Sequence, residues 1–550
     1  MKTIIKLFWA LFIALGFSSM VNAQPAYKMN LYYDSVFVNN VKAIFTSDGT
    51  LHWRPTGLPG YCVPKNNFAC TIFAGSLWIG GIDADGKLHT AAETYYQNGT
   101  DFWPGPIMDS ASYSYHNDTV WDKIYVVNKS TIDSFKSGLF GGKIPKSILN
   151  WPGNGDVSLG EMPQLAPYAN VSKSGYYNPY AGDYPLIRGD EAAYMIYNDA
   201  RVSKHTETGG LKFGIEVHLM AYQFQSTDTA VNEATFLHYD IYNRSKNTYD
   251  SVYAGNWVDM DIGNGDNDYI GCDTLNNYWY TYNAVPYDSS VSGTFAGEVG
   301  YCGTPPSQAV LYLCDTMKHF QYYNNDFTSH GNPVNTRMYY NYLHSIWGDS
   351  THVKYWDTTS INTNYFYPGN PVTGTGWSEV SAKAPMGDMR GLSSIAPFTF
   401  TPGSCKTVDI ALVFAQNQHP GPTANLQSVA LLSKYISDIK SFYNSQAYGC
   451  DSGLLAVNEI KTTGTEVVVY PNPSKGVFQV QMENGKLTID NEKIQIGVYN
   501  ILGQEVYSEL STVYSPLSIN ISNNPSGVYF YRIIDENGAP IATGKMVIQK

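Results

Sequence analysis

The sequence predicts a mostly β protein: a β-sandwich-like body of one or two β-rich units with one packed helix, followed by a small C-terminal Ig-like β-sandwich. The 550-residue chain has 45 tyrosines and 49 glycines, and only 15% of its residues are charged. Such a composition favours strands and solvated loops over helices. The clearest apolar patterns have the two-residue period of strands, and a single segment stands out with the period of an amphipathic helix.

The first 23 residues have the pattern of a secretory signal peptide. Lys2 and Lys6 form a basic start, residues 7–17 are an apolar run too short to span a bilayer, and small or apolar residues occupy 21–23. No later run approaches the roughly 20 apolar residues of a membrane helix. We therefore expect cleavage before Gln24, export, and no membrane span.

The body between the signal peptide and the C-terminal domain has about 430 residues, more than one compact core usually holds. A Pro-, Gly-, Asn- and Tyr-rich stretch from Lys146 to Gly182 indicates a long connection. We place an N-terminal unit at residues 24–165, a main unit at 166–455 and the C-terminal domain at 456–550.

The charge and the tyrosines of the chain limit its partners. The formal net charge is −13, and an acidic chain with few lysines and arginines lacks the basic patches that nucleic-acid binding needs. Tyrosine has a flat apolar face and a polar tip, which suit contact with a glycan or a protein. The alternative is that tyrosine only fills the faces of the sheets.

Residues 71–92 have the pattern of a β-hairpin. Residues 71–79 and 87–92 are strand-like, and they flank the turn sequence Asp83-Ala84-Asp85-Gly86. The Asp-Gly pair can adopt the positive φ that such a turn requires.

Two further strands are expected at residues 211–225 and 235–243, because apolar and polar side chains alternate along both. If the two strands pair, four polar side chains converge on one face. A carboxylate beside an imidazole can perform acid–base chemistry or bind a metal. The alternative is that these side chains face solvent. The four residues are Glu216, His218, His238 and Asp240.

One amphipathic helix is expected near the end of the body. Its apolar residues recur every three or four positions, Pro420 and Pro422 precede it, and Gly449 follows it. We expect it to pack against a sheet. The apolar positions are Leu426, Val429, Leu432, Ile436, Ile439 and Phe442.

An acidic loop at residues 257–273 carries the strongest chemical motif of the body, with five aspartates in fifteen positions among glycines and asparagines. Carboxylates this close repel one another unless a cation or hydrogen bonds compensate them, and calcium accepts about six to eight oxygen ligands in flexible geometry. We expect a structural calcium ion here, with a solvated turn-rich loop as the alternative. The loop is not an EF-hand, because Ile270 stands twelfth from Asp259, where a glutamate is needed. The expected ligands are Asp259, Asp261, Asp266, Asp268 and Asp273, with Asn264 a lesser candidate.

Seven cysteines lie in the body, which in an exported protein indicates disulfides and one remaining thiol. Connectivity does not follow from sequence, but proximity along the chain suggests pairs 62–70 and 302–314. A pair 405–450 would tie the last strands of the body to the helix that follows them, and Cys272 is then free. The cysteines are Cys62, Cys70, Cys272, Cys302, Cys314, Cys405 and Cys450. None has a spacing typical of zinc ligands.

The C-terminal residues contain short strands separated by turn signals, which predict a small β-sandwich. Strands are expected at 467–470, 495–499, 505–508 and 527–533. The motif blocks Val467–Phe478, Val498–Val506, Pro525–Tyr531 and Gly544–Lys550 occur in the order of the type A C-terminal sorting domain of the bacterial type IX secretion system. The chain resembles this family. The resemblance implies a secreted or cell-surface protein and contact with the type IX machinery.

The body also resembles a large group of exported proteins that carry the same tail and have no established activity to transfer. The resemblance rests on residues 77–81, 101–106, 187–191, 205–210, 322–327, 342–347 and 387–390, together with the acidic loop. It implies no substrate.

Two functions remain open from the sequence. The preferred hypothesis is a non-catalytic binding or structural β-protein, because the body lacks the motifs of serine hydrolases, zinc proteases and phosphate-binding loops. The alternative is a secreted hydrolase that acts on polysaccharide or protein. A glycosidase needs two carboxylates that are close only in space, and Glu161, Glu191 and Glu216 are candidates for such a pair.

Overall fold

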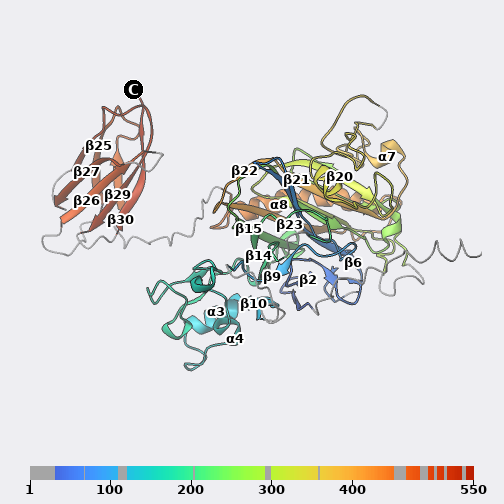
Figure 1. Ribbon diagram of the computed structural model, residues 1–550, viewed down its shortest axis with the longest axis horizontal. Helices are drawn as coiled ribbons and strands as arrows, with labels where there is room; N and C mark the ends of the chain where they lie inside the picture. The colour runs from blue at the N-terminus through green and yellow to red at the C-terminus, as the bar shows by residue number, and fades with distance from the viewer. Residues whose placement is uncertain are drawn as a thin grey trace, which may run out of the picture. The chain divides into compact units, whose positions relative to one another are not determined.

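We describe the protein from a computed structural model, in which the chain forms two compact units, a body (Met1–Gly453) and a tail unit (Leu454–Lys550) (Figure 1). The predicted signal peptide lies outside the described residues. So do most of the turn that the sequence predicts at Asn500-Ile501-Leu502-Gly503 and the whole of the turn that it predicts at Asn537-Gly538. The described residues are 31–66, 68–108, 120–201, 205–290, 299–356, 359–450, 466–483, 493–500, 505–512, 517–535 and 540–550. Among them, no helix combines the length and the apolar character that a membrane span requires.

The largest sheet of the body has nine antiparallel strands, which confirms the mostly β prediction. Its order is β10-β13-β14-β15-β23-β19-β18-β17, and β9 also pairs with β13. β9 and β10 lie before residue 165, the end of the expected N-terminal unit, and both pair with β13, which lies after it. Strands from both expected units therefore share this sheet. The bounds are β9 Trp103–Pro104, β10 Tyr125–Asn128, β13 Glu191–Asn198, β14 Ile215–Gln223, β15 Ala234–Asn243, β17 Asp268–Asp273, β18 Tyr278–Asn283, β19 Ser307–Tyr312 and β23 Cys405–Ala415.

A six-stranded sheet has the order β20-β21-β16-β7-β8, with β22 paired to β16. A four-stranded sheet, β1-β2-β5-β6, and the pairs β3-β4 and β11-β12 complete the strands of the body. The bounds are β1 Tyr33–Val36, β2 Lys42–Thr46, β3 Trp53–Arg54, β4 Leu58–Pro59, β5 Tyr61–Cys62, β6 Cys70–Ile72, β7 Ala74–Asp83, β8 Leu88–Ala91, β11 Tyr168–Ala169, β12 Tyr184–Pro185, β16 Tyr249–Asp259, β20 Met317–Asn324, β21 Met389–Ile395 and β22 Phe398–Phe400.

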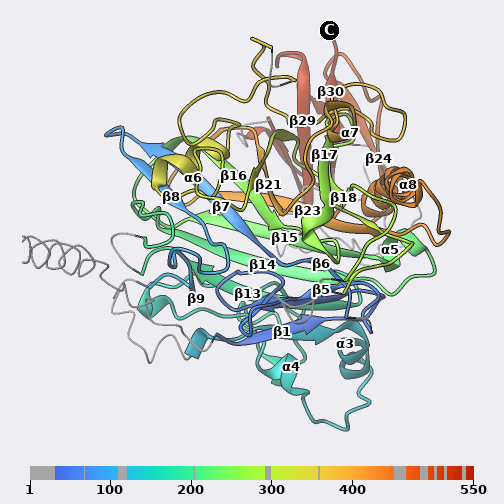
Figure 2. The same cartoon turned by 90° about the vertical axis from the view of Figure 1, so that its right-hand side faces the viewer.

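The main core lies between the sheets, as in a β-sandwich. One face of β14 contributes Val217 and Leu219, the six-stranded sheet contributes Ile79 and Phe320, and the four-stranded sheet contributes Phe45. All five side chains are almost fully buried. Figure 2 shows β14 and β15 below the strands of the six-stranded sheet.

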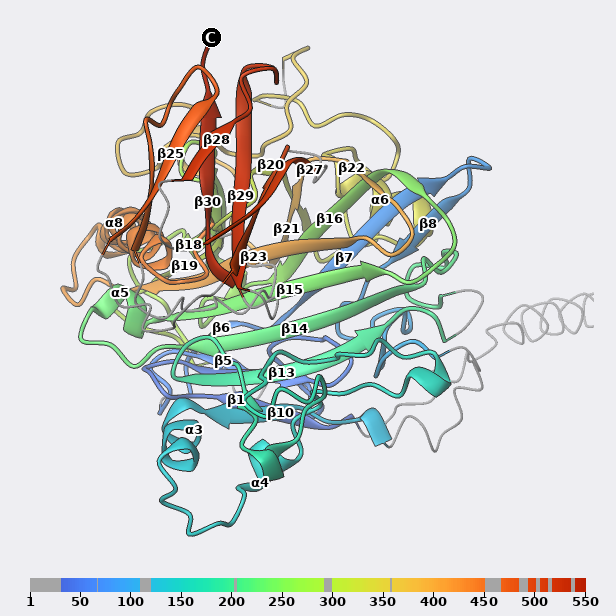
Figure 3. The same cartoon turned by 90° about the vertical axis from the view of Figure 1, so that its left-hand side faces the viewer.

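The opposite face of the nine-stranded sheet forms a second core. Helix α8 (Ala424–Asn444) confirms the predicted amphipathic helix, and its Leu432 and Ile436 belong to the same buried cluster as Phe236 and Val413 of the sheet. Figure 3 shows β23, β15, β14, β13 and β10 following one another, with α3 and α4 beyond β10. The other short helices are α3 Lys129–Lys136, α4 Lys146–Leu149, η1 Val157–Leu159, η2 Pro179–Ala181, α5 Thr229–Asn232, η3 Gly265–Asn267, α6 Thr336–Tyr342 and α7 Glu379–Ala382.

The predicted hairpin and the predicted pair of strands are both confirmed. β7 and β8 pair antiparallel, and Gly86 has φ +77° in the turn between them. β14 and β15 also pair antiparallel, with His218 opposite Asp240.

The disulfides are Cys62–Cys70, as predicted, and Cys314–Cys450. Cys272 is free, as predicted, but the pairs 302–314 and 405–450 are wrong, because Cys302 and Cys405 are free too. The six-residue strand β19 lies between positions 302 and 314. An extended strand of this length separates its ends by about 20 Å, far beyond the reach of a disulfide.

The tail unit contains two sheets, β24-β25-β28 and β27-β26-β29-β30, around a core that includes Phe478, Ile496 and Met546. The four predicted tail strands are confirmed as β24, β26, β27 and β29. The bounds are β24 Glu466–Tyr470, β25 Val477–Glu483, β26 Lys493–Tyr499, β27 Glu505–Thr512, β28 Leu517–Asn520, β29 Gly527–Asp535 and β30 Pro540–Ile548.

The two ends of the tail sequence meet in this unit. The Asn472 side chain donates to the carbonyl of Lys545 at 2.7 Å and accepts from the amide of Val547 at 2.9 Å. The amide of Ser474 donates to the carbonyl of Val547. The Pro-Asn-Pro-Ser segment therefore covers the outer edge of the last strand.

Candidate functional site

The acidic loop begins at the end of β16 and meets a segment from much later in the chain. Carboxylate oxygens of Asp259, Asp261 and Asp388 lie within 4.8 Å of one another. Asp388 comes close because β16 pairs with β21, which places Arg390 opposite Asp259. Asp388 lies outside the acidic loop, in the block 387–390 by which the body resembles other exported proteins.

Arg390 supplies a buried positive charge at this cluster. Its guanidinium contacts Asp259 at 3.1 Å and Asp388 at 2.6 Å, and its side chain is only 5% exposed. The neighbouring Met389 points into the main core. Because successive side chains of a strand point to opposite faces of the sheet, Met389 is apolar on the core side and Arg390 is charged on the side of the carboxylates.

The other predicted ligands have different positions. Asp268 is buried, and its Oδ2 accepts a hydrogen bond from the amide of Ile262 at 2.9 Å. Burial, together with the charges of Asp261, Asp288 and Asp388, raises the pKa of Asp268 well above its usual range.

Asp266, Asp273 and Asn264 form local turns. Asp266 is exposed in η3, and its amide donates to the Asn264 side chain at 3.2 Å. Asp273 accepts from the amides of Leu275 and Asn276 at 3.1 and 3.0 Å. Neither Asp266 nor Asp273 belongs to the three-carboxylate group found among the described residues, and Asp268, although buried close by, does not belong to it either.

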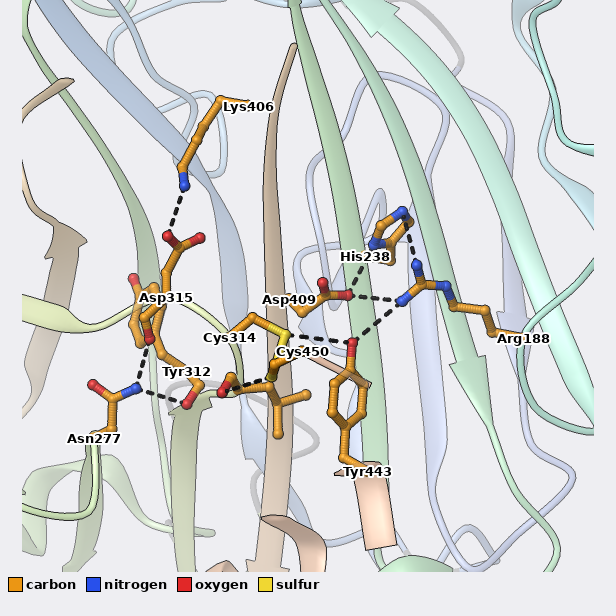
Figure 4. Close-up of a disulfide and its surroundings, with 11 residues drawn as sticks. Arg188, His238, Asn277, Tyr312, Cys314, Asp315, Lys406, Asp409, Tyr443 and Cys450 are labelled. Carbon is orange, nitrogen blue, oxygen red and sulfur yellow. Dashed lines mark hydrogen bonds and ion pairs between the residues drawn. A yellow bond between two sulfur atoms is a disulfide. The ribbon is translucent and has the colours of Figure 1, made fainter. Parts of the chain in front are cut away.

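The second set of predicted polar residues lies on the α8-facing side of the nine-stranded sheet. Figure 4 shows one of them, His238, with Arg188, Asp409 and Tyr443. His238 Nδ1 is 2.8 Å from Asp409 Oδ1, and His238 Nε2 is 3.3 Å from Asp240 Oδ2. Arg188 joins this network by donating to Asp409 at 2.9 Å and to the Tyr443 hydroxyl at 3.3 Å. Burial alone would lower the pKa of His238, but its hydrogen bonds to Asp240 and Asp409 outweigh burial and raise it.

Glu216 and His218 form a neighbouring group. His218 Nε2 is 2.8 Å from Glu216 Oε1, and Arg244 donates to Glu216 Oε2. The amide of Ile107 donates to Oε2 at 2.8 Å. The four polar residues predicted to converge are therefore on one face, where they form two ion-paired groups.

Of the three glutamates considered for a hydrolase, two lie near the same arginine. Arg244 contacts Glu216 and also donates to the carbonyl of Gly160, the residue before Glu161, at 2.7 Å. Glu191 instead accepts from the amides of Phe37 and Val38 at 2.6 and 2.8 Å.

A cleft of about 400 Å³ opens beside β20, an edge strand of the six-stranded sheet. His330 stacks on Trp347 with ring centroids 4.0 Å apart and an interplanar angle of 18°. Sequence reasoning missed this cleft, because its residues come from β20 and from loops between residues 330 and 366. We call it the aromatic cleft; its lining residues are Tyr322, Asn324, His330, Trp347, Thr351, His352, Lys354 and Phe366.

The tail unit has a clear relationship to known proteins. Residues 468–549 match the family model of the secretion system C-terminal sorting domain. The protein is a cargo of the type IX secretion system. The cargo is therefore secreted or displayed at the cell surface, and its tail unit implies contact with the secretion machinery.

Three solved structures have a remote similarity to the cargo. A polysaccharide lyase is 6% identical with a TM-score of 0.19, over 66% of the cargo and 37% of the lyase. The adhesin domain of Epf from Streptococcus pyogenes is 8% identical with a TM-score of 0.12, over 61% and 91% of the two chains. The BSP domain of a biofilm associated protein is 9% identical with a TM-score of 0.14, over 94% and 81%.

The cargo thus spans little more than a third of the lyase. The comparison with curated proteins gives no match.

Proposed function

We propose that the body of this cargo is a non-catalytic glycan-binding protein that acts at the cell surface or after secretion. The observation that supports this proposal best is the aromatic cleft. Its rings Tyr322, Trp347 and Phe366 lie beside polar side chains in an open depression. Binding sites for small ligands combine apolar walls with a few polar groups in this way.

The side chains of the aromatic cleft suit a sugar. Trp347 and Tyr322 are partly exposed, and aromatic rings offer flat apolar surfaces to the C–H faces of a pyranose. Asn324, Thr351 and Lys354 can exchange hydrogen bonds with hydroxyl groups. The stacking of His330 on Trp347 and the hydrogen bond from the Trp347 amide to the Thr351 carbonyl at 2.8 Å hold the indole in place.

The residues of the cleft favour binding over hydrolysis. A glycosidase places two carboxylates about 5–10 Å apart across the scissile bond. Among the described residues that line the aromatic cleft, none is an aspartate or a glutamate. Glu216 is held by Arg244, His218 and a backbone amide, an arrangement that a buried structural carboxylate also has. A secreted hydrolase remains the alternative.

A panel of plant, animal and bacterial polysaccharides tests the proposal with the purified full-length protein. We expect saturable binding to at least one polysaccharide without release of reducing ends. Trp347→Ala should weaken that binding roughly tenfold or more, because a buried aromatic contact often dominates an interface. His352→Ala, at an exposed lining residue, provides a second variant that leaves the core unchanged.

Tyr176→Ala is the matched control, because Tyr176 is 55% exposed and does not line the cleft. Its binding and melting temperature should equal those of the wild type. Release of reducing ends would contradict the non-catalytic role. Binding that survives both cleft substitutions would exclude the aromatic cleft as the site.

A further inference from the structure

The acidic loop leads to an inference that is independent of the proposed glycan site. We propose that Asp259, Asp261 and Asp388 bind one divalent cation, that the buried Asp268 beside them completes the site, and that calcium is the ion that fits. The site would join the end of β16 to the start of β21. It differs from the set expected from the sequence, because it includes Asp388 and leaves out Asp266 and Asp273.

The spacing of the carboxylates matches a single ion. One oxygen from each of Asp259, Asp261 and Asp388 lies within 4.8 Å of the others. Calcium–oxygen distances are about 2.3–2.6 Å, so two oxygens on the same ion are at most about 5 Å apart. The three carboxylates can therefore reach one calcium ion with little movement.

Asp268 provides a second, independent observation. Its Oδ1 is buried and accepts no hydrogen bond from any of the described residues. Its Oδ2 accepts from the amide of Ile262, and its carbonyl accepts from the amide of Gly387 at 3.2 Å. Asp268 is thus held between the segments that carry Asp261 and Asp388. A buried carboxylate oxygen without a donor is costly, and a cation would supply its missing partner.

The charges at the site also require compensation. When ionised, the three carboxylates of Asp259, Asp261 and Asp388 carry three negative charges. Arg390 contributes one positive charge, through its contacts with Asp259 and Asp388. At least two negative charges remain in a partly buried place, where like charges repel more strongly than in water. A divalent cation balances them.

The backbone of the loop leaves space for the carboxylates. A Cβ atom at Gly265 would lie 2.5 Å from Asp261 Oδ1, so only glycine fits beside this carboxylate in the present conformation. A set of carboxylate oxygens on a glycine-containing loop suits calcium, which accepts many oxygens in irregular geometry, better than the strict octahedron of magnesium.

The test uses the purified full-length protein, stripped with a chelator and titrated with CaCl2 or MgCl2 in a calorimeter. We expect one calcium ion per chain, weaker binding of magnesium, and a higher melting temperature with calcium. Asp388→Asn and Asp268→Asn should each weaken calcium binding by about tenfold or more. Asp266→Asn and Asp273→Asn are matched controls from the same loop, and they should bind calcium as the wild type does.

Four results would overturn the proposal. First, a wild type that binds no calcium would show that Arg390 and backbone amides alone compensate the charges of the carboxylates. The control substitutions would weaken binding as much as the test substitutions if the loop attracted cations only through its net charge. Magnesium would bind as tightly as calcium if the site were octahedral. Unchanged calcium binding in both Asp388→Asn and Asp268→Asn would place the ion elsewhere. Melting curves of every variant in chelator show that each one is folded, and Asp261→Asn replaces any variant that is not.

Discussion

The titration of His238 links one residue to the stability of the central sheet. Its side chain is 14% exposed and lies between Asp240 and Asp409, whose negative charges favour the imidazolium form. The pKa of His238 is raised above 6.5, the value for an unperturbed histidine. A group whose pKa is higher in the folded state stabilises the protein fully below its unfolded pKa, and this contribution is lost as the pH rises through the folded pKa.

We therefore expect His238→Gln to lower the free energy of unfolding by about 1.5–3 kcal/mol below pH 6.5, because it removes charge-assisted hydrogen bonds. The difference from the wild type should shrink as the pH rises through the raised pKa. Urea unfolding across this pH range measures it, and His419→Gln, at an exposed histidine, is the control. A difference that is constant with pH would show that His238 acts only by packing.

The residue scale also shows how far the sequence predicts the candidate sites. The two-residue period was sufficient to place Glu216, His218, His238 and Asp240 on one face. It did not predict Arg188 and Asp409, because their approach depends on β23 pairing with β15 and on a loop that ends at β13. The sequence did not predict Asp388 as a ligand for the same reason, since the spacing of residues within one loop carries no information about the strand that pairs beside it.

At the scale of elements, helix α8 stabilises one face of the nine-stranded sheet. Leu432 is fully buried between the helix and the sheet, whereas Ser437 of the same helix is exposed. We expect Leu432→Ala to lower the free energy of unfolding by about 2–5 kcal/mol, because it removes buried methyl groups and leaves a cavity. Ser437→Ala should change it by less than about 0.5 kcal/mol. Chemical denaturation measures both, and equal effects would contradict the packing of α8.

Elements with a strong local signal were predicted well. Helix α8, the β7–β8 hairpin and the β14–β15 pair follow from periodicity and turn chemistry within about thirty residues. The disulfides were predicted only where the cysteines are close on both sides of one turn, as at Cys62 and Cys70. Cys314 meets Cys450 instead of Cys302 because β19 carries it away from Cys302 and because α8 precedes Cys450.

At the scale of the whole molecule, the body and the tail unit have separate cores. The tail core contains residues from Phe478 to Ile548 only, and the body cores contain none of these residues. Separate cores suit a cargo in which one part of the chain carries the sorting signal and another part carries the function.

Deletion of residues 467–550 tests this division of roles. The sorting domain spans 468–549, so we expect the truncated protein to remain in the periplasm and to be almost absent from the cell surface and the medium. Its body should still unfold cooperatively, because its cores are intact. Cell fractionation and thermal melting measure the two properties separately. A reporter that by itself reaches only the periplasm, fused to residues 454–550, is the matched control, and its export to the surface or the medium would show that the tail unit is sufficient. Continued secretion of the truncated cargo would mean that the body carries a second export signal, whereas loss of cooperative unfolding would mean that the body depends on the tail unit to fold.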